Sequence, residues 1–171
     1  MKPVLLVDDE PQIRLLVKTL LSEEGFESIE ASDGCGAFAT AKRLDGAISL
    51  LLTDIDMPGS PMNGIELARA VKSEFPDVPI LLVSGQRPAT DLDSVAPGNV
   101  FVKKPFDPRV FADTARKLVT QASQPNHGPV RRQLGNTARG TVWSRLCLDA
   151  PDGEGRGTIA GGTNLRVGVV K

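Results

Sequence analysis

The stretch that decides the fold is LLLTDIDMP, which occupies residues 50–58. Three leucines and a threonine form a short apolar run, and Asp54 ends it abruptly. A continuous apolar run of this length is typical of a strand that is buried on both faces of a parallel α/β sheet. Because ligands of such sheets bind at the carboxyl ends of the strands, Asp54 stands where a reactive side chain is expected.

The rest of the first 121 residues alternates between apolar runs of strand length and segments with helical spacing. The runs predict four more strands, near residues 4–7, 27–31, 80–83 and 100–102. Periodic apolar residues and helix-stop signals predict helices over residues 11–24, 37–44, 65–72 and 108–119, and a weak fourth helix over 89–95. Five strands that alternate with five helices predict a doubly wound, five-stranded parallel sheet of the flavodoxin-like (βα)5 type.

The composition changes after Gln121. Residues 1–121 carry 13 Lys and Arg against 18 Asp and Glu, whereas residues 122–171 carry 7 against 3 and hold nine of the 17 glycines. We expect a domain over residues 1–121 and a Gly-rich tail over 122–171 that is mostly disordered or loosely docked. The acidic first part argues against direct DNA binding, and the tail is too weakly basic to argue for it.

The apolar runs are too short for a signal peptide or a membrane span. A cytoplasmic protein without membrane contact is therefore expected.

Four of the predicted strands end in polar or charged residues, namely Asp8 and Asp9, Asp54, Ser84 and Lys104. In a parallel sheet these residues share one edge, so they can converge. Two like charges about 4 Å apart repel by roughly 4 kcal/mol at an intermediate dielectric constant, so the carboxylates should bind a proton or a cation. Oxygen-only ligation suits Mg²⁺, which keeps several waters and favours phosphate groups. A carboxylate can also serve as a covalent acceptor.

Taken together, Asp8-Asp9, Asp54, Ser84 and Lys104-Pro105 resemble the signature of the receiver domain of two-component response regulators. The resemblance covers about residues 3–121, and a regulator consisting of this single domain is expected. It implies that Asp54 accepts a phosphoryl group from a phosphohistidine of a sensor kinase or phosphotransfer protein.

The resemblance also implies roles for the neighbours of Asp54. Asp9 and Asp54 would bind Mg²⁺ directly, together with the backbone carbonyl of Asp56, and Asp8 would help through bound water. Lys104 would pair with the phosphoryl group and precede a cis peptide bond to Pro105.

Two further residues would read the phosphorylated state. Ser84 would swing toward the phosphoryl oxygens, and Phe101 matches the position of the switch aromatic. The chain would catalyse only its own phosphorylation and slow dephosphorylation. It would signal through a downstream protein or a homodimer that contacts the fourth and fifth helices.

The sequence departs from the family pattern in two segments. The loop over residues 59–63 looks about two residues longer than the common form. Residues 85–99 have little helix potential, so a short or ragged fourth helix is expected.

Other interpretations of the same residues remain open. Asp8 and Asp9 could cap the next helix, Asp54 and Asp56 could be turn acids, and Phe101 could be a core residue. Two functional alternatives also stand. The Asp54-Ile55-Asp56 string resembles the motif of haloacid-dehalogenase-type phosphatases, although Met57 and Pro58 follow it here. A receiver fold could also act as an adaptor without phosphorylation.

Overall fold

The strands and helices follow the alternation that the sequence predicts. The computed structural model describes residues 2–85 and 99–122. Its strands are β1 (Val4–Val7), β2 (Ser28–Ala31), β3 (Leu50–Asp54), β4 (Ile80–Ser84) and β5 (Val100–Lys103). Its helices within these ranges are α1 (Pro11–Glu23), α2 (Gly34–Arg43), α3 (Gly64–Glu74) and α5 (Pro108–Ala122). The expected fourth helix and the tail beyond Ala122 lie outside the described residues.

The five strands form one parallel sheet in the order β2-β1-β3-β4-β5. The chain winds one way from β1 to β2 and the other way from β3 to β5, so β1 and β3 flank the point where the order reverses. Val7 pairs with Thr53 in this register, which places the residues that follow β1 beside the end of β3. The predicted doubly wound parallel sheet is confirmed.

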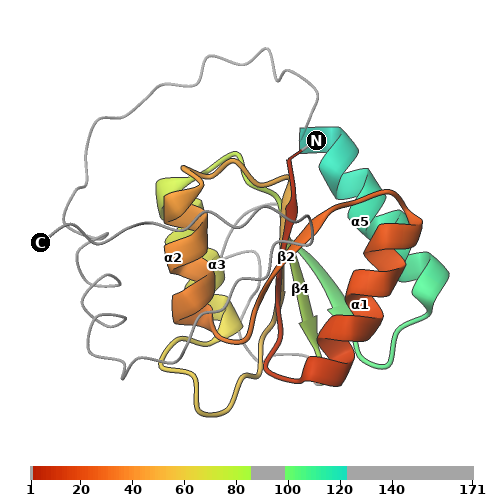
Figure 1. The fold of residues 1–171 in the computed structure, drawn as a ribbon, viewed down its shortest axis with the longest axis horizontal. Coiled ribbons are helices and arrows are strands. Elements are labelled where there is room, and N and C mark those ends of the chain that lie inside the picture. The colour runs from red at the N-terminus through yellow and green to blue at the C-terminus, as the bar shows by residue number, and fades with distance from the viewer. Residues whose placement is uncertain (1, 86–98, 123–171) are drawn as a thin grey trace, which may run out of the picture.

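Helices cover both faces of the sheet. Figure 1 shows α2 and α3 on one side of the strands, and α1 and α5 on the other. Every residue of β1, β3 and β4 is buried, which explains their continuous apolar sequences. Alternate residues serve different layers, because successive side chains of a strand point to opposite faces. Leu5 and Leu51 pack in the layer under α2 and α3, whereas Leu6 and Leu52 pack in the layer under α1 and α5.

Three of the four helices in the described ranges begin at a side chain that caps them, and α1 is the exception. Asp33 and Asp107 accept hydrogen bonds from the first turns of α2 and α5. Asn63 and Glu66 form a reciprocal capping box at the start of α3. These caps also set where each loop at the carboxyl edge of the sheet has to end. None of the helices in the described ranges is both long and apolar enough to cross a membrane.

Candidate functional site

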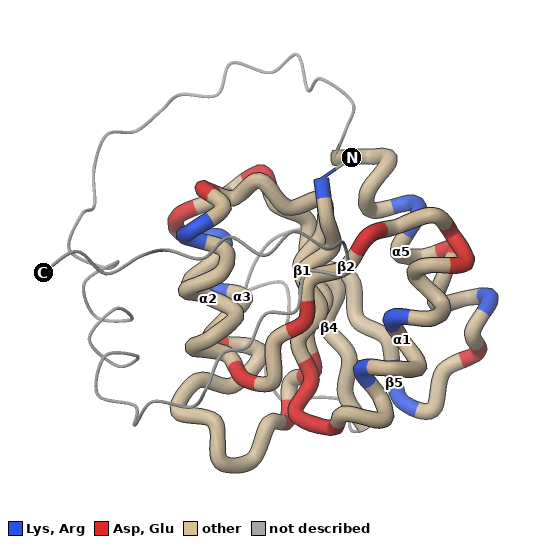
Figure 2. Tube along the Cα trace, viewed as in Figure 1, with Lys and Arg blue, Asp and Glu red and all other residues tan. Residues whose placement is uncertain are grey.

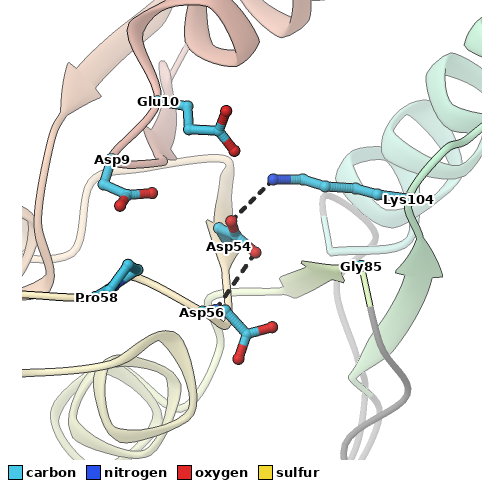
Figure 3. Close-up of a pocket in the computed structure, with 7 residues that line it drawn as sticks. All are labelled: Asp9, Glu10, Asp54, Asp56, Pro58, Gly85 and Lys104. Atoms are coloured by element: carbon cyan, nitrogen blue, oxygen red, sulfur yellow. Dashed lines mark hydrogen bonds and ion pairs between the residues drawn. The ribbon is translucent and has the colours of Figure 1, made fainter.

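The polar residues that end the strands converge at the carboxyl edge of the sheet. Figure 2 shows acidic segments gathered at the lower end of the strands, and Figure 3 shows the side chains that meet there. They border a pocket of about 540 Å³ that is lined by Asp9, Glu10, Asp54, Asp56, Pro58, Gly85 and Lys104. The first, third and fifth strands thus contribute charged side chains to one place.

Lys104 joins two acids from different strands. Its Nζ atom lies 2.8 Å from Asp8 Oδ2 and 2.8 Å from Asp54 Oδ2. Both acids are nearly covered, with 3% of Asp8 and 5% of Asp54 exposed. The backbone N–H of Lys104 donates to the carbonyl of Ser84 at 2.8 Å, and the Lys104–Pro105 peptide bond is cis. The lysine is therefore held by the sheet as well as by its charge.

The charges at this site do not balance. Burial raises the pKa of Asp54 above its usual value and the charge of Asp8 adds to the rise, although the hydrogen bond and charge of Lys104 oppose it. Burial also disfavours the charged form of Lys104, but its bonds to Asp54 and Asp8 outweigh burial and raise the pKa of the ammonium. Lys104 therefore stays protonated, and its single positive charge faces the carboxylates of both Asp8 and Asp54.

Three carboxylates are close enough to share a cation. One oxygen from each of Asp8, Asp9 and Asp54 lies within 4.8 Å of the other two. This donor set holds only oxygen atoms, and hard divalent cations such as Mg²⁺ prefer such ligands. A divalent cation would also reduce the repulsion among these three carboxylates, so the residues present fit Mg²⁺.

The helix-capping interpretation of Asp8 does not describe its contacts. Asp8 Oδ1 accepts a hydrogen bond from the backbone N–H of Glu10 at 2.8 Å, ahead of the helix. The N-cap of α1 is Glu10, and its side chain makes no capping bond. Asp8 is thus fixed by a local turn, with its other carboxylate oxygen directed at Lys104.

Ser84 and Asp56 meet in a contact that the sequence did not predict. The Ser84 hydroxyl donates to Asp56 Oδ2 at 2.6 Å, and the Asp56 backbone N–H reaches Asp54 Oδ1 at 3.4 Å. Ser84 is 1% exposed, whereas Asp56 is exposed. The family resemblance gave Asp56 a role only through its backbone carbonyl, and no spacing rule reveals which way its side chain turns.

Phe101 lies on β5, two strands away from Asp54. It is partly buried and packs against the core layer under α2 and α3. This contact agrees with a core residue, and a switching role for Phe101 stays a prediction.

The loop from β3 to α3 is attached to the start of α2. The Ser60 hydroxyl donates to the carbonyl of Met62 at 2.7 Å and accepts from the backbone N–H of Gly34 at 3.2 Å. Met62 is fully buried. The long loop is therefore packed into the domain, and its serine is a supporting residue that sequence reasoning missed.

The sequence of this chain matches a known protein family and several of its members. The family model of the response regulator receiver domain matches residues 4–116. The chain is 33% identical to the nitrogen assimilation regulatory protein NtrX of Azorhizobium caulinodans, over 90% of this chain and 38% of that protein. It is also 33% identical to the chemotaxis protein CheY of Pseudomonas aeruginosa, over 67% of this chain and 94% of CheY.

Solved structures agree with the sequence matches. The receiver domain of NtrX from Brucella abortus superposes with a TM-score of 0.62 at 33% identity, over 68% of this chain and 98% of that domain. The chain spans 38% to 64% of the length of the first regulators it matches. The match to the family covers most of the chain and contains every residue of the site described above. This chain belongs to the family of response regulator receiver domains.

Proposed function

We propose that this chain takes up a phosphoryl group on Asp54 and passes the change on to a partner protein. The observation that carries the proposal is the position of Asp54 at the end of β3, bonded to Lys104 and bordering the pocket. An Asp54 carboxylate oxygen would bond to phosphorus while the phosphorus–nitrogen bond of a phosphohistidine breaks. The imidazole leaves with the bond electrons and takes a proton from water.

The neighbours of Asp54 have the chemistry that this transfer needs. Asp9, Asp54 and the backbone carbonyl of Asp56 would hold Mg²⁺, with support from Asp8, and the ion would neutralise charge on the phosphoryl group. Lys104 places a second positive charge beside Asp54. Ser84 would donate a hydrogen bond to a phosphoryl oxygen once its hydroxyl turns. We expect no turnover beyond self-phosphorylation and slow self-dephosphorylation.

The partners we propose are a sensor histidine kinase or phosphotransfer protein upstream, and a protein or a second copy of this chain downstream. The downstream contact would use α5, on which Val110 is 61% exposed. We propose a cytoplasmic location. We also propose that residues 1–121 make no direct contact with DNA, since they carry a net negative charge.

The test is chemical labelling with acetyl phosphate and Mg²⁺. Wild-type protein should gain one base-labile phosphate, and Asp54→Asn should gain none. Asp113→Asn, an exposed change on α5, is the matched control and should label like the wild type. Unchanged labelling of Asp54→Asn would refute the assignment. A wild-type chain that never labels but still binds its partner would instead be an adaptor.

Membership in the receiver family favours the phosphoryl switch over the phosphatase alternative. The Asp56 side chain, which would be the general acid of such an enzyme, is hydrogen-bonded to Ser84. Asp54→Asn labelling and steady hydrolysis of small phosphate esters can be measured on the same samples, so the two ideas are separated directly.

A further inference from the structure

The hydrogen bond between Ser84 and Asp56 is a contact that the proposed phosphoryl transfer does not use. The donor comes from the end of β4 and is buried, and the acceptor comes from the loop that follows β3 and is exposed. Figure 3 shows the Asp56 carboxylate turned away from the Lys104 ammonium, although the two residues border the same pocket. The carboxylate of Asp56 is therefore engaged with Ser84 and not with the cation of the site.

A serine hydroxyl carries one hydrogen, so it can donate to only one acceptor at a time. In this structure that hydrogen is directed at Asp56 Oδ2 over a short distance of 2.6 Å. A phosphoryl oxygen on Asp54 would need the same hydrogen. The two acceptors therefore compete, and one bond must break before the other forms.

We propose that Asp56 is a positioning residue whose side chain holds the Ser84 hydroxyl in the unphosphorylated protein and so weakens phosphoryl binding at Asp54. This proposal rests on the proposed function and adds a residue to it. Hydrogen bonds to charged groups are stronger than neutral ones, but exposure of the Asp56 carboxylate to water weakens this one. The held hydroxyl should lower the affinity for a phosphoryl group by about three- to ten-fold.

Asp56 also acts in a second way that has to be separated from the first. Asp56 borders the same pocket as Asp54, so its negative charge also repels a phosphoryl group on Asp54. This repulsion does not depend on Ser84, whereas the restraint on the hydroxyl does. A double-mutant cycle between the two positions therefore isolates the restraint.

The experiment measures binding of beryllofluoride, a phosphoryl mimic, in the presence of Mg²⁺. Four proteins are compared by NMR or calorimetric titration: wild type, Asp56→Ala, Ser84→Ala and the double variant. All of them keep the backbone carbonyl of residue 56. Asp56→Ala should tighten binding in the Ser84 background by about three- to ten-fold more than it does in the Ser84→Ala background.

If Asp56→Ala tightens binding by the same factor with Ser84 and with alanine at position 84, the proposal is wrong, because Asp56 then acts through charge alone. Weaker binding to Asp56→Ala than to the wild type would overturn it as well. Asp56→Asn keeps the size of the side chain, loses the charge and still offers an oxygen, so it should fall between wild type and Asp56→Ala. It also replaces Asp56→Ala in the cycle if the alanine variant fails to fold.

Asp54→Asn separates a failure of this inference from a failure of the proposed function. If the wild type binds beryllofluoride and Asp54→Asn does not, the assignment of Asp54 stands whatever the cycle returns. If neither binds, the proposed function is wrong and the inference is wrong with it.

Discussion

Gly64 packs directly onto the backbone of Asp54. A methyl group at Gly64 would overlap the carbonyl oxygen of Asp54 and would lie 2.8 Å from its carbonyl carbon. The backbone N–H of Gly64 also donates to the carbonyl of Ile55 at 3.1 Å. Helix α3 can therefore begin against the end of β3 only because residue 64 has no side chain.

We predict that Gly64→Ala destabilises the protein by roughly 1–3 kcal/mol, because the atoms that obstruct the methyl group belong to the backbone and cannot rotate away. The measurement is the free energy of unfolding in urea. Gly36→Ala in α2 is the control. Its methyl group would lie 3.4 Å from the Asp33 side chain, its nearest neighbour, and alanine is a better helix former than glycine. Equal stability of Gly64→Ala and wild type would contradict the close packing.

Lys104→Met should lower stability by roughly 3 kcal/mol at neutral pH in metal-free buffer, because it leaves Asp8 and Asp54 buried without their cation. Added Mg²⁺ should restore part of the loss by binding the same carboxylates. Lys103→Met, at the exposed neighbouring position, should change stability by about 0.5 kcal/mol or less. Similar losses in both variants would show that the contacts of Lys104 add nothing.

The pH dependence of stability should carry the signature of Asp54. Because its pKa in the folded protein lies above the unfolded value of 3.8, the folded state binds more protons at Asp54 than the unfolded chain does. Its contribution to stability is therefore present below pH 3.8 and is lost as the pH rises through the folded pKa. Asn at position 54 cannot titrate, so the unfolding free energy of Asp54→Asn should rise relative to that of the wild type as the pH increases through this window.

Urea unfolding of the two proteins in EDTA, from pH 4 to pH 7.5, checks this prediction. The difference in unfolding free energy should grow with pH and then level off. Adding Mg²⁺ at pH 7 should stabilise the wild type more than Asp54→Asn, because only the wild type has a carboxylate at position 54 to bind the ion. A difference that shrinks with rising pH would contradict the raised pKa of Asp54.

Ser60→Ala should cost about 1 kcal/mol, because the hydroxyl joins the loop after β3 to the start of α2. Amide hydrogen exchange at Gly34 and Met62 should become faster, since both N–H groups donate to this hydroxyl. Ser32→Ala is the control, as its hydroxyl makes only an exposed 3.4 Å contact with Asp33. Unchanged exchange at Gly34 would mean that the loop is held by other contacts.

The sequence was sufficient to bring the main site residues together. Asp8, Asp54, Ser84 and Lys104 each stand at or just after the end of an apolar run, and parallel strands place such ends on one edge. Their mutual approach then follows from the order of the strands. No side-chain detail is needed for this step, so strand ends alone predict that these residues meet.

The parts that sequence reasoning missed depend on side-chain direction and on loop paths. The Ser84–Asp56 bond requires a particular rotamer at the end of a strand, and the Ser60 contacts require a loop to turn back onto α2. Helix α2 also begins at Gly34, three residues before the predicted start, because Asp33 caps it. The Ser84 and Ser60 contacts depend on tertiary packing, which a periodic pattern does not encode, whereas the Asp33 cap is a local signal in the sequence.

The partners in the ion pair between Lys104 and Asp8 are separated by 96 positions in the chain. During synthesis Asp8 and Asp54 leave the ribosome first, and Lys104 follows only after β5, the fifth strand of the described sheet. A chain that stops short of residue 104 would carry the acids without compensation. Completion of the sheet at β5 therefore decides when a nascent chain can first adopt its final electrostatic state.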